Sequence, residues 1–497
     1  MKIIIVGGGS SGWLTAAYMS NNIPNADITV IDKEVGNPVG VGEATILNFD
    51  GFMLECGFPT AEWFYELDAT IKTGIMFPGW VTPEHEIWHP FYTNVEYPDC
   101  CSWDVWAQTQ HLSFKEYGTT GYKSSILNKV DMQAHDKRFG YHVDCSKMVN
   151  FIQRKLDGRI NWIKSAVVDI KRDGDVITNL VLNNGEEHSA DLYVDCTGFA
   201  SILKTPKKVD ITGRLFCNTA IAGHVQYIDK DKEMRPYVIS EAVDHGWIWQ
   251  IPTRTRFGTG LVFNKDITDI ETAKDFLVNY WQGRIDKDKL RVIDWTPNYT
   301  SNMWQANVVS IGLSAGFIEP LESTGLFLIQ VAIKRLTEKI KFGYYDDVAI
   351  DFFNAQMTKY FEDGIDFVNM HYSKTQRTEP FWQYVKETQK ESGMQQHYMS
   401  LMVDPELSFK RLTPPGLTDH TIFSPVNWFL WLVQLGYPVF KSMTHVHPAR
   451  VEFLTRLFER NEHVRVLRSL PHQSAIDIIL LEGMNNGYVP IPDNNRP

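Results

Sequence analysis

Residues 2–12 read KIIIVGGGSSG, and this stretch decides the fold of the N-terminal part of the chain. The run KIIIV has the length and the apolar composition of a buried strand. It leads directly into Gly7, Gly9 and Gly12, which form the pattern G-x-G-x-x-G. In this pattern the first glycine permits a tight turn, the second lets backbone approach a pyrophosphate, and the third allows a helix to pack closely on the strand. The stretch therefore predicts a strand, a phosphate-binding turn and the start of a helix.

The segment that follows completes a β-α-β unit. Residues 12–21 are typical of a helix, and residues 27–32, DITVID, are typical of a second buried strand. Asp32 ends this strand 20 residues after Gly12, where an acid that binds a ribose is expected. The acid at this spacing argues against the alternative, a glycine-rich turn without a ligand. Further strands are predicted at 191–196 and 308–311, and helices at 272–280, 326–341, 352–369 and 452–467.

The composition excludes several classes of protein. The 497 residues carry a formal net charge of −12, so a nucleic acid, which requires a basic surface, is not an expected partner. Residues 421–440 form a long uncharged stretch, but their two prolines and polar residues argue against a membrane span. We expect a buried aromatic element or an oligomer contact there. The six scattered cysteines form no C-x-x-C pair, which favours a reducing, cytoplasmic location.

A zinc-protease pattern, H-E-x-x-H, occurs at residues 85–89, HEIWH. Such a site needs both histidines on one face of a helix, but Pro90 pushes His89 out of helical geometry. No third ligand follows at a recognisable spacing. We therefore expect no metal here and interpret the segment as a loop that carries packed aromatic side chains.

Two aromatic residues stand in a strand-like segment, residues 246–252, GWIWQIP. Trp247 and Trp249 would share one face of this strand, and Pro252 would end it. A stripe of core aromatic side chains is the simpler interpretation of this pattern alone.

Two other segments carry polar residues in apolar surroundings. Residues 317–325, FIEPLESTG, precede an apolar helix, and Ser323 and Thr324 are typical of N-cap positions. The unpaired amides at Thr324 and Gly325, together with the helix dipole, would make an anion site. Lys72 lies in the largely apolar run KTGIMFPGW, where desolvation would lower its pKa and leave a reactive amine.

Together these segments resemble the flavin-dependent halogenases of the tryptophan halogenase family. The resemblance implies an α/β fold: an FAD-binding Rossmann-like fold of the flavin monooxygenase type, with a mixed sheet and a mostly helical C-terminal region packed against it. It rests on G-x-G-x-x-G at 7–12, GVGEAT at 40–45, the lysine and I-x-F-x-x-W at 72–80, DLYVDCTGF at 191–199, W-x-W-x-I-P at 247–252 and F-x-x-P-x-x-S-x-G at 317–325.

The expected domain organisation follows from the same resemblance. Residues 1–345 would form the FAD-binding and halogenase module, with interleaved substrate-pocket segments at about 60–140 and 215–295. Residues 346–497 would form the helical region that completes the substrate pocket. We also expect a homo-oligomer, either a dimer or a trimer.

The resemblance implies a reaction in which FADH2, supplied by a separate NAD(P)H-dependent flavin reductase, reacts with O2 and a halide to give hypohalous acid. Thr324 and Gly325 match the halide-binding residues of the family. Trp247 and Trp249 match a barrier that keeps the organic substrate away from the flavin. Lys72 matches the catalytic lysine, which either hydrogen-bonds hypohalous acid or forms a haloamine.

The remaining site residues are also assigned by resemblance. Glu322 matches the acid that assists halogen delivery or removes the ring proton, and Ser323 would support it. His89 and Phe91 match residues that stack against an aromatic substrate. The residues expected to bind the cofactor are Gly7, Gly9, Ser10, Ser11, Gly12, Asp32, Glu43, Ala44, Thr45, Gly312, Leu313 and Leu326.

The C-terminal third matches the family weakly. The tyrosine pair and the glutamate that hold free tryptophan in tryptophan-specific members have no recognisable counterpart there. We therefore expect an indole, another small electron-rich arene or a larger indole-bearing molecule, with bromide or iodide favoured over chloride. A flavin-dependent aromatic hydroxylase and a non-catalytic flavoprotein are the alternatives, and the tryptophan pair, Lys72 and Glu322 argue against them.

Overall fold

The computed structural model describes residues 1–33, 42–91, 122–132, 139–403, 421–438 and 448–485, and the structural statements below concern these residues. Gly40 and Val41 of the predicted motif at 40–45 lie outside them.

A six-stranded sheet contains the N-terminal strand, in the order β21-β22-β13-β1-β2-β9. β1 pairs in parallel with β2 and β13, whereas β21 runs antiparallel to β22, so the sheet is mixed as predicted. The bounds of its strands are β1 Lys2–Val6, β2 Asp27–Asp32, β9 Asn161–Lys164, β13 Leu192–Asp195, β21 Trp304–Gln305 and β22 Val308–Ser310.

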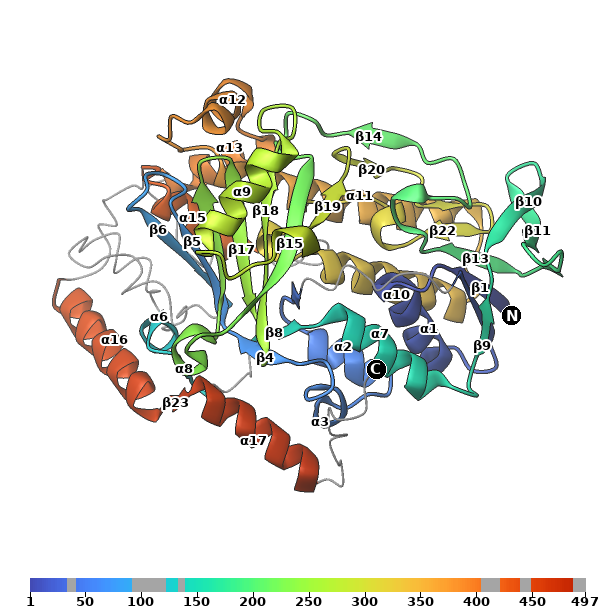
Figure 1. Cartoon of the computed structure of the whole chain (residues 1–497), viewed down its shortest axis with the longest axis horizontal. Coiled ribbons are helices and arrows are strands. Elements are labelled where there is room, and N and C mark those ends of the chain that lie inside the picture. Colours follow the sequence, from blue (N-terminus) through green and yellow to red (C-terminus); the bar gives the residue numbers. More distant parts are fainter. Residues whose placement is uncertain (34–41, 92–121, 133–138, 404–420, 439–447, 486–497) are drawn as a thin grey trace.

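Helix α1 (Ser10–Asn22) connects β1 to β2 and lies on one face of this sheet. It contacts α7 (Cys145–Leu156) and α10 (Gly325–Lys341), and Figure 1 shows α1 and α10 beside β1 at the N-terminal end of the molecule. β1 is almost entirely apolar because both of its faces are covered. The predicted β-α-β unit is therefore confirmed.

A seven-stranded sheet forms the centre of the molecule, in the order β19-β15-β18-β17-β16-β5-β6 (Figure 1). Its pairs are antiparallel except for β16 with β5, and every residue of β17 is buried. The bounds are β5 Gly74–Pro78, β6 Glu86–Pro90, β15 Thr219–Gln226, β16 Val238–Val243, β17 Gly246–Pro252, β18 Arg256–Phe263 and β19 Arg291–Asp294.

Four smaller sheets complete the β structure. The three-stranded sheet β3-β8-β4 matters most for the site, because it carries Lys72 at the end of β4. The bounds are β3 Glu43–Ala44, β4 Thr70–Lys72, β7 Lys129–Val130, β8 Gly140–Val143, β10 Val167–Asp173, β11 Val176–Leu182, β12 Glu187–His188, β14 Lys208–Asp210, β20 Asn298–Thr300 and β23 Leu470–Pro471.

The C-terminal part is helical. α15 packs against β6 and α13, and its tryptophans are buried, so the predicted buried aromatic element is confirmed for the described residues. No helix in these ranges combines the length and the hydropathy that a membrane span requires. The helices are α11 Asp347–His371, α12 Pro380–Thr388, α13 Gly393–Met402, α15 Pro425–Gln434, α16 Pro448–Arg468 and α17 His472–Asn485.

Short helices connect the sheets. They are α2 Phe49–Glu55, α3 Thr60–Trp63, α6 Tyr122–Ile126, α8 Lys230–Glu233 and α9 Ile270–Tyr280, with the 3₁₀ turns η1 Gly198–Ala200, η2 Lys287–Lys289, η3 Gly312–Ser314 and η4 Pro320–Glu322.

One segment differs from its predicted structure. Residues 85–89 were expected to form a loop, but Glu86–Pro90 form strand β6 at the edge of the central sheet. The terminal proline is tolerated because β6 is an edge strand. The helix that H-E-x-x-H requires is therefore absent, as predicted. Within the described ranges, His, Cys, Asp and Glu side chains form no group of three or more that could hold a metal ion.

Candidate active site

The glycine turn between β1 and α1 is sterically fixed at two of its three motif glycines. Gly7 has φ +112°, and a Cβ there would lie 2.3 Å from the carbonyl oxygen of Cys196. A Cβ on Gly12 would lie 1.9 Å from the carbonyl oxygen of Gly7. A Cβ on Gly9, in contrast, would meet nothing in the described structure within 4 Å. The turn is therefore closed on β13 and on its own helix, but open beside Gly9, as the predicted role of each glycine requires.

The first turn of α1 has free backbone amides. Gly9 occupies the N-cap position, where it offers no side-chain cap, and Ser10 and Ser11 begin the helix. The carboxylate of Asp32 lies beside the turn, because a Cβ on Gly8 would fall 2.0 Å from Asp32 Oδ2. Open space, free amides and a neighbouring carboxylate fit the pyrophosphate and the ribose of FAD.

A second turn contacts this one. Gly312 begins η3 with φ +80°, and a Cβ there would lie 2.8 Å from the Cβ of Ser11. The close approach therefore requires glycine. Leu313 in the same turn is 43% exposed. The other residues expected to bind the cofactor are half-buried or buried: Glu43, Ala44, Thr45 and Leu326.

Lys72 ends β4 and is fully buried. Its Nζ donates hydrogen bonds to Ser323 Oγ (2.8 Å) and to the carbonyl oxygen of Thr45 (3.1 Å), and lies 4.8 Å from the ring centroid of Phe91. Burial lowers the pKa of Lys72 from 10.5 to about 7, and the negative charge of Glu322 opposes part of this shift. The amine is therefore poised between its charged and neutral forms near neutral pH.

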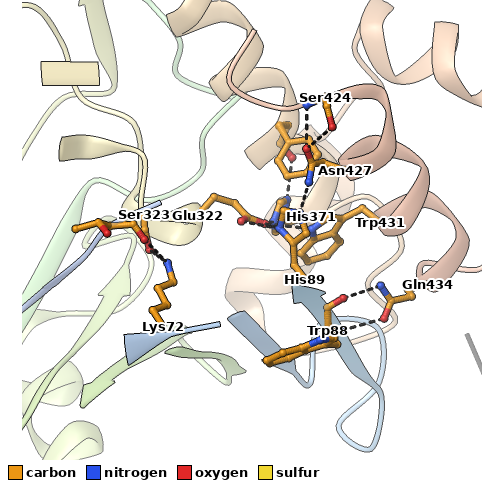
Figure 2. A network of polar contacts seen from close by, with 12 residues as sticks. Lys72, Trp88, His89, Glu322, Ser323, His371, Ser424, Asn427, Trp431 and Gln434 are labelled. Atoms are coloured by element: carbon orange, nitrogen blue, oxygen red, sulfur yellow. Dashed lines mark hydrogen bonds and ion pairs between the residues drawn. The ribbon is translucent and has the colours of Figure 1, made fainter. Parts of the chain in front are cut away.

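Ser323 and Glu322 leave the same turn in different directions (Figure 2). Glu322 ends η4, and Ser323 has the left-handed conformation with φ +61°. The hydroxyl of Ser323 faces Lys72, whereas the side chain of Glu322 extends toward α11 and α15. Two of the predicted catalytic residues thus share one turn but contact different groups.

The carboxylate of Glu322 is 2% exposed and lies among three N–H donors. Oε1 is 2.7 Å from His371 Nε2 and 3.1 Å from Trp431 Nε1, and Oε2 is 2.8 Å from His89 Nδ1. Burial alone would raise the pKa of Glu322, but its contacts with His89 and His371 lower it from 4.5 to about 2. The surroundings therefore hold Glu322 as a carboxylate.

His89 lies on β6 and connects Glu322 to α15. Asn427 Oδ1 accepts a hydrogen bond from the backbone N–H of Ser424 (2.9 Å), so its Nδ2 is the atom 2.9 Å from His89 Nε2. His89 is 4% exposed, with its ring centroid 6.4 Å from that of Phe423. Its expected stacking against a substrate stays a prediction.

The N-terminus of α10 presents free hydrogen-bond donors. Thr324 occupies the N-cap position, as predicted, but no side chain caps the helix. The hydroxyl of Thr324 is fully buried and has no hydrogen-bond partner among the described residues. A Cβ on Gly325 would meet nothing within 4 Å. A buried hydroxyl, free amides and open space at the start of a helix can bind a small anion.

Trp247 and Trp249 share one face of β17, with ring centroids 6.2 Å apart. Glu319 holds the first of them, because its Oε2 accepts hydrogen bonds from Trp247 Nε1 (3.3 Å) and from the hydroxyl of Tyr372 (2.7 Å). Oε1 of Glu319 accepts two backbone N–H groups. Burial raises the pKa of Glu319, and these hydrogen bonds act against the rise. The motif that carries Glu322 therefore also fixes Trp247.

Sequence reasoning missed four residues of this site: Glu319, His371, Asn427 and Trp431. Glu319 lay inside a recognised motif, where its fixed place beside Glu322 was a usable signal. Asn427 and Trp431 lie in the C-terminal third, which matches the family weakly and offered no motif to mark them. His371 ends α11, two residues beyond the predicted end of that helix. No spacing in the sequence relates it to Glu322, since the contact depends on how α11 packs.

Comparison with known proteins supplies the family. Residues 2–445 match the family model described as "Tryptophan halogenase". The chain belongs to this family. It is 29% identical over 418 residues to the tryptophan 6-halogenase ThaL of Streptomyces albogriseolus, with 78% of each chain covered. It is also 29% identical over 430 residues to the tryptophan 7-halogenase RebH of Lentzea aerocolonigenes, with 80% of each chain covered.

Solved structures give the same result. The flavin-dependent halogenase Xcc4156 from Xanthomonas campestris superimposes with a TM-score of 0.86 at 26% identity, over 99% of both chains. BrvH, a flavin-dependent halogenase from Brevundimonas sp. BAL3, superimposes with a TM-score of 0.85 at 25% identity, over 96% of this chain and 99% of BrvH. The predicted FAD-binding α/β fold is therefore confirmed. As a member of this family, the protein is an FADH2-dependent halogenase, which is an oxidoreductase. The roles of individual residues stay predictions.

The motif glycines allow a matched test of the FAD site. Gly12→Ala places a Cβ against the backbone of Gly7, and we expect it to destabilise the protein by about 2 kcal/mol or more. Gly9→Ala meets no atom of the described residues within 4 Å, so the melting temperature without flavin should stay close to that of the wild type. Its methyl group would occupy pyrophosphate space and weaken FAD binding about tenfold or more. Thermal unfolding and flavin titration check both, and equal FAD affinity for Gly9→Ala would contradict this placement.

The lowered pKa of Lys72 predicts a pH-dependent gain in stability on its removal. The folded protein disfavours the charged amine of Lys72, and this lowers the free energy of unfolding. The loss of stability is fully present below pH 7 and disappears as pH rises toward 10.5, where the amine is neutral in the unfolded chain as well. Lys72→Met should therefore raise the free energy of unfolding, by an amount on the order of 3 kcal/mol at pH 6 and by less at pH 9. Urea unfolding at several pH values measures this. The control is Lys208→Met, because Lys208 is exposed. A gain in the free energy of unfolding for Lys72→Met that does not change with pH would refute the prediction.

Proposed function

We propose that the chain transfers a halogen to an electron-rich aromatic ring, using FADH2 from a separate flavin reductase, O2 and a halide. The observation that carries this proposal is the fully buried amine of Lys72, held between the hydroxyl of Ser323 and the carbonyl oxygen of Thr45. Burying a lysine costs stability, and strongly shifted pKa values concentrate at functional sites. The nearby carboxylate of Glu322 provides the complementary base.

FAD bound at the glycine turn supplies the oxidation of halide by O2. In our proposal the halide is held at the start of α10 by the backbone of Thr324 and Gly325. The buried, unpartnered hydroxyl of Thr324 and the uncapped helix N-terminus support this assignment. Trp247 and Trp249 form the barrier between the flavin and the organic substrate, and Glu319 keeps the first of these rings in place. Hypohalous acid is small enough to pass where an arene is not.

Lys72 directs the hypohalous acid toward the ring. Its ammonium form donates a hydrogen bond to the oxygen of the acid, which makes the halogen more electrophilic and fixes its position. The ring carbon bonds the halogen while the halogen–oxygen bond breaks, and the oxygen leaves as water after taking a proton from Lys72. Glu322 then removes the ring proton and restores aromaticity. A haloamine on Lys72 is the other form in which the same residue could hold the halogen.

The substrate in this proposal is an indole or an indole-bearing arene. ThaL and RebH carry tryptophan in their names, and tryptophan shares the indole ring. The C-terminal residues available to this site, Asn427 and Trp431, are occupied by hydrogen bonds to His89 and Glu322. The residues that would hold the amine and the carboxylate of free tryptophan are not recognised in the sequence. We therefore favour a substrate that lacks these two groups. Bromide and iodide are favoured over chloride because both are more easily oxidised.

One reaction tests the proposal. The protein is mixed with FAD, a flavin reductase, NADH, O2, sodium bromide and indole, and the products are analysed by mass spectrometry. We expect the paired isotope pattern of one bromine. Lys72→Met should lower product formation about 100-fold or more while FAD binding is retained.

The matched control is Lys204→Met, because Lys204 is also buried, and burial lowers its pKa to about 8. Lys204 contacts the backbone of Asn302 and lies outside the proposed catalytic residues. We expect this variant to halogenate like the wild type. An oxygen added to the ring in place of bromine would point to a hydroxylase. The absence of any halogenated product across bromide, chloride and iodide with a panel of arenes would overturn the proposal.

A further inference from the structure

The carboxylate of Glu322 has one partner that the mechanism above does not use. His371, at the end of α11, lies 2.7 Å from Glu322 Oε1 through its Nε2. The imidazole is fully buried, and its ring centroid lies 3.6 Å from that of Trp431. Figure 2 shows both rings beside the end of the Glu322 side chain.

The hydrogen bonds of His371 fix its protons. Nδ1 lies 2.8 Å from the backbone carbonyl oxygen of Phe367, which can only accept, so Nδ1 carries a proton. A neutral imidazole has a single ring proton, so its Nε2 would then face Glu322 with a lone pair. Two acceptors 2.7 Å apart would repel each other. One further proton must therefore lie between His371 Nε2 and Glu322 Oε1.

The other donors place this proton on the imidazole. Glu322 Oε1 also lies 3.1 Å from Trp431 Nε1 and 3.0 Å from His89 Nδ1, both of which donate. An oxygen that already accepts from these two N–H groups is stabilised as an anion and is a poor place for a proton of its own. Burial lowers the pKa of His371 below its ordinary value, and the hydrogen bond and charge of Glu322 act against this shift. The charge is placed on the imidazole by geometry, because the 2.7 Å contact of Nε2 with Oε1 requires a proton between the two atoms.

His89 contrasts with His371 in this respect. Asn427 donates its amide hydrogen to His89 Nε2, so that nitrogen accepts and the single ring proton of a neutral imidazole lies on Nδ1, facing Glu322. The two histidines therefore contribute differently: His89 provides a hydrogen bond, and His371 provides a hydrogen bond and a charge.

We propose that His371 is a positioning residue for the halogenation reaction, which holds Glu322 as a carboxylate through a buried imidazolium–carboxylate pair and leaves Glu322 Oε2 as the oxygen that takes the ring proton. The inference rests on the proposed function. Oε1 has three donors, whereas Oε2 has His89 alone, so Oε2 keeps the free lone pair.

The pair also explains how the acid is reset. When Oε2 takes the ring proton, the O–H of Glu322 lies beside the positive charge of His371, with Lys72 nearby. The charge of His371 favours release of that proton, and the amine of Lys72, which gave its own proton to the leaving oxygen, takes up a proton in turn, so both groups return to their starting forms for the next turnover. The titratable groups that face the pair are His89 and Lys72, and the remaining side chains packed on His371 are aromatic: Phe77, Trp80, Phe367 and Trp431.

The first experiment is a pH profile of the halogenation rate at saturating arene. Glu322 acts as a base, so the halogenation rate falls as pH falls through the pKa of Glu322. In the wild type this fall in rate lies below the pH range in which the enzyme is assayed. His371→Leu removes both charge and hydrogen bond, and should move the midpoint of the acidic limb upward by at least about one pH unit. His371→Gln keeps an N–H donor, and should preserve more of the rate while still showing the shift.

A purely structural role would lower the rate equally at all pH values. An unchanged acidic limb in both variants would therefore overturn the inference. Flavin binding and the release of hypohalous acid, measured with a chemical trap, should be unchanged in His371→Gln, because His371 is not among the residues assigned to the flavin and the halide.

The second experiment does not depend on halogenation. Long-range proton–nitrogen spectra of protein labelled with ¹⁵N-histidine report whether each ring nitrogen carries a proton, and His371→Gln assigns the signals. We expect both nitrogens of His371 to be protonated at pH 7, and Nε2 to lose its proton in Glu322→Gln. An unprotonated Nε2 in the wild type between pH 6 and 8 would overturn the inference. Failure to halogenate any arene, with these spectra as expected, would overturn the proposed function alone.

Discussion

The hydrogen bond from Lys72 Nζ to Ser323 Oγ joins two segments that lie 251 residues apart. Lys72 ends strand β4 of the small sheet β3-β8-β4, and Ser323 lies two residues before Gly325, the first residue of α10. Both groups are buried, so water does not compete with this hydrogen bond. It sets the separation between the amine and the turn that carries Glu322 and Thr324. This contact therefore holds the amine of Lys72, the turn that carries Glu322 and the start of α10 close together.

Near this contact lie two ionisable groups, Lys72 and Glu322, whose surroundings act differently on their charges: they disfavour the charged form of the lysine and favour the charged form of the glutamate. Lys72 has few partners for its charge, and burial lowers its pKa to about 7. Glu322 is equally buried but has three N–H donors, and its pKa falls to about 2. One group is thereby able to give and take a proton near neutral pH, and the other stays a base. Such divergence between neighbouring groups is how a single site assigns acid and base roles. The aromatic rings of α11 and α15 pack around the partners of Glu322 and keep water from weakening its hydrogen bonds.

Much of the fold could be predicted because its signals are local. The apolar run of β1, the three glycines and Asp32 lie within one β-α-β unit, where strand, turn and helix follow from composition and spacing. The helices α9 and α10 were predicted almost to their ends for the same reason. Strand β6 was missed because its partner β5 and its contact with α15 supply the stabilisation, and neither is visible in the letters HEIWH. α11 extends beyond its predicted end because tertiary packing buries the last turn.

The sequence by itself determined the dinucleotide-type turn, the buried lysine, the position at which α10 begins and the tryptophan pair, because each of these is set by residue types a few positions apart. Only the tertiary structure decided which groups surround the carboxylate of Glu322. His89 comes from an edge strand, His371 from the end of a long helix and Trp431 from another helix, and they meet because apolar surfaces of α11 and α15 pack against the central sheet. Packing depends on the shape and burial of whole elements, so it places protons and charges that no short motif specifies.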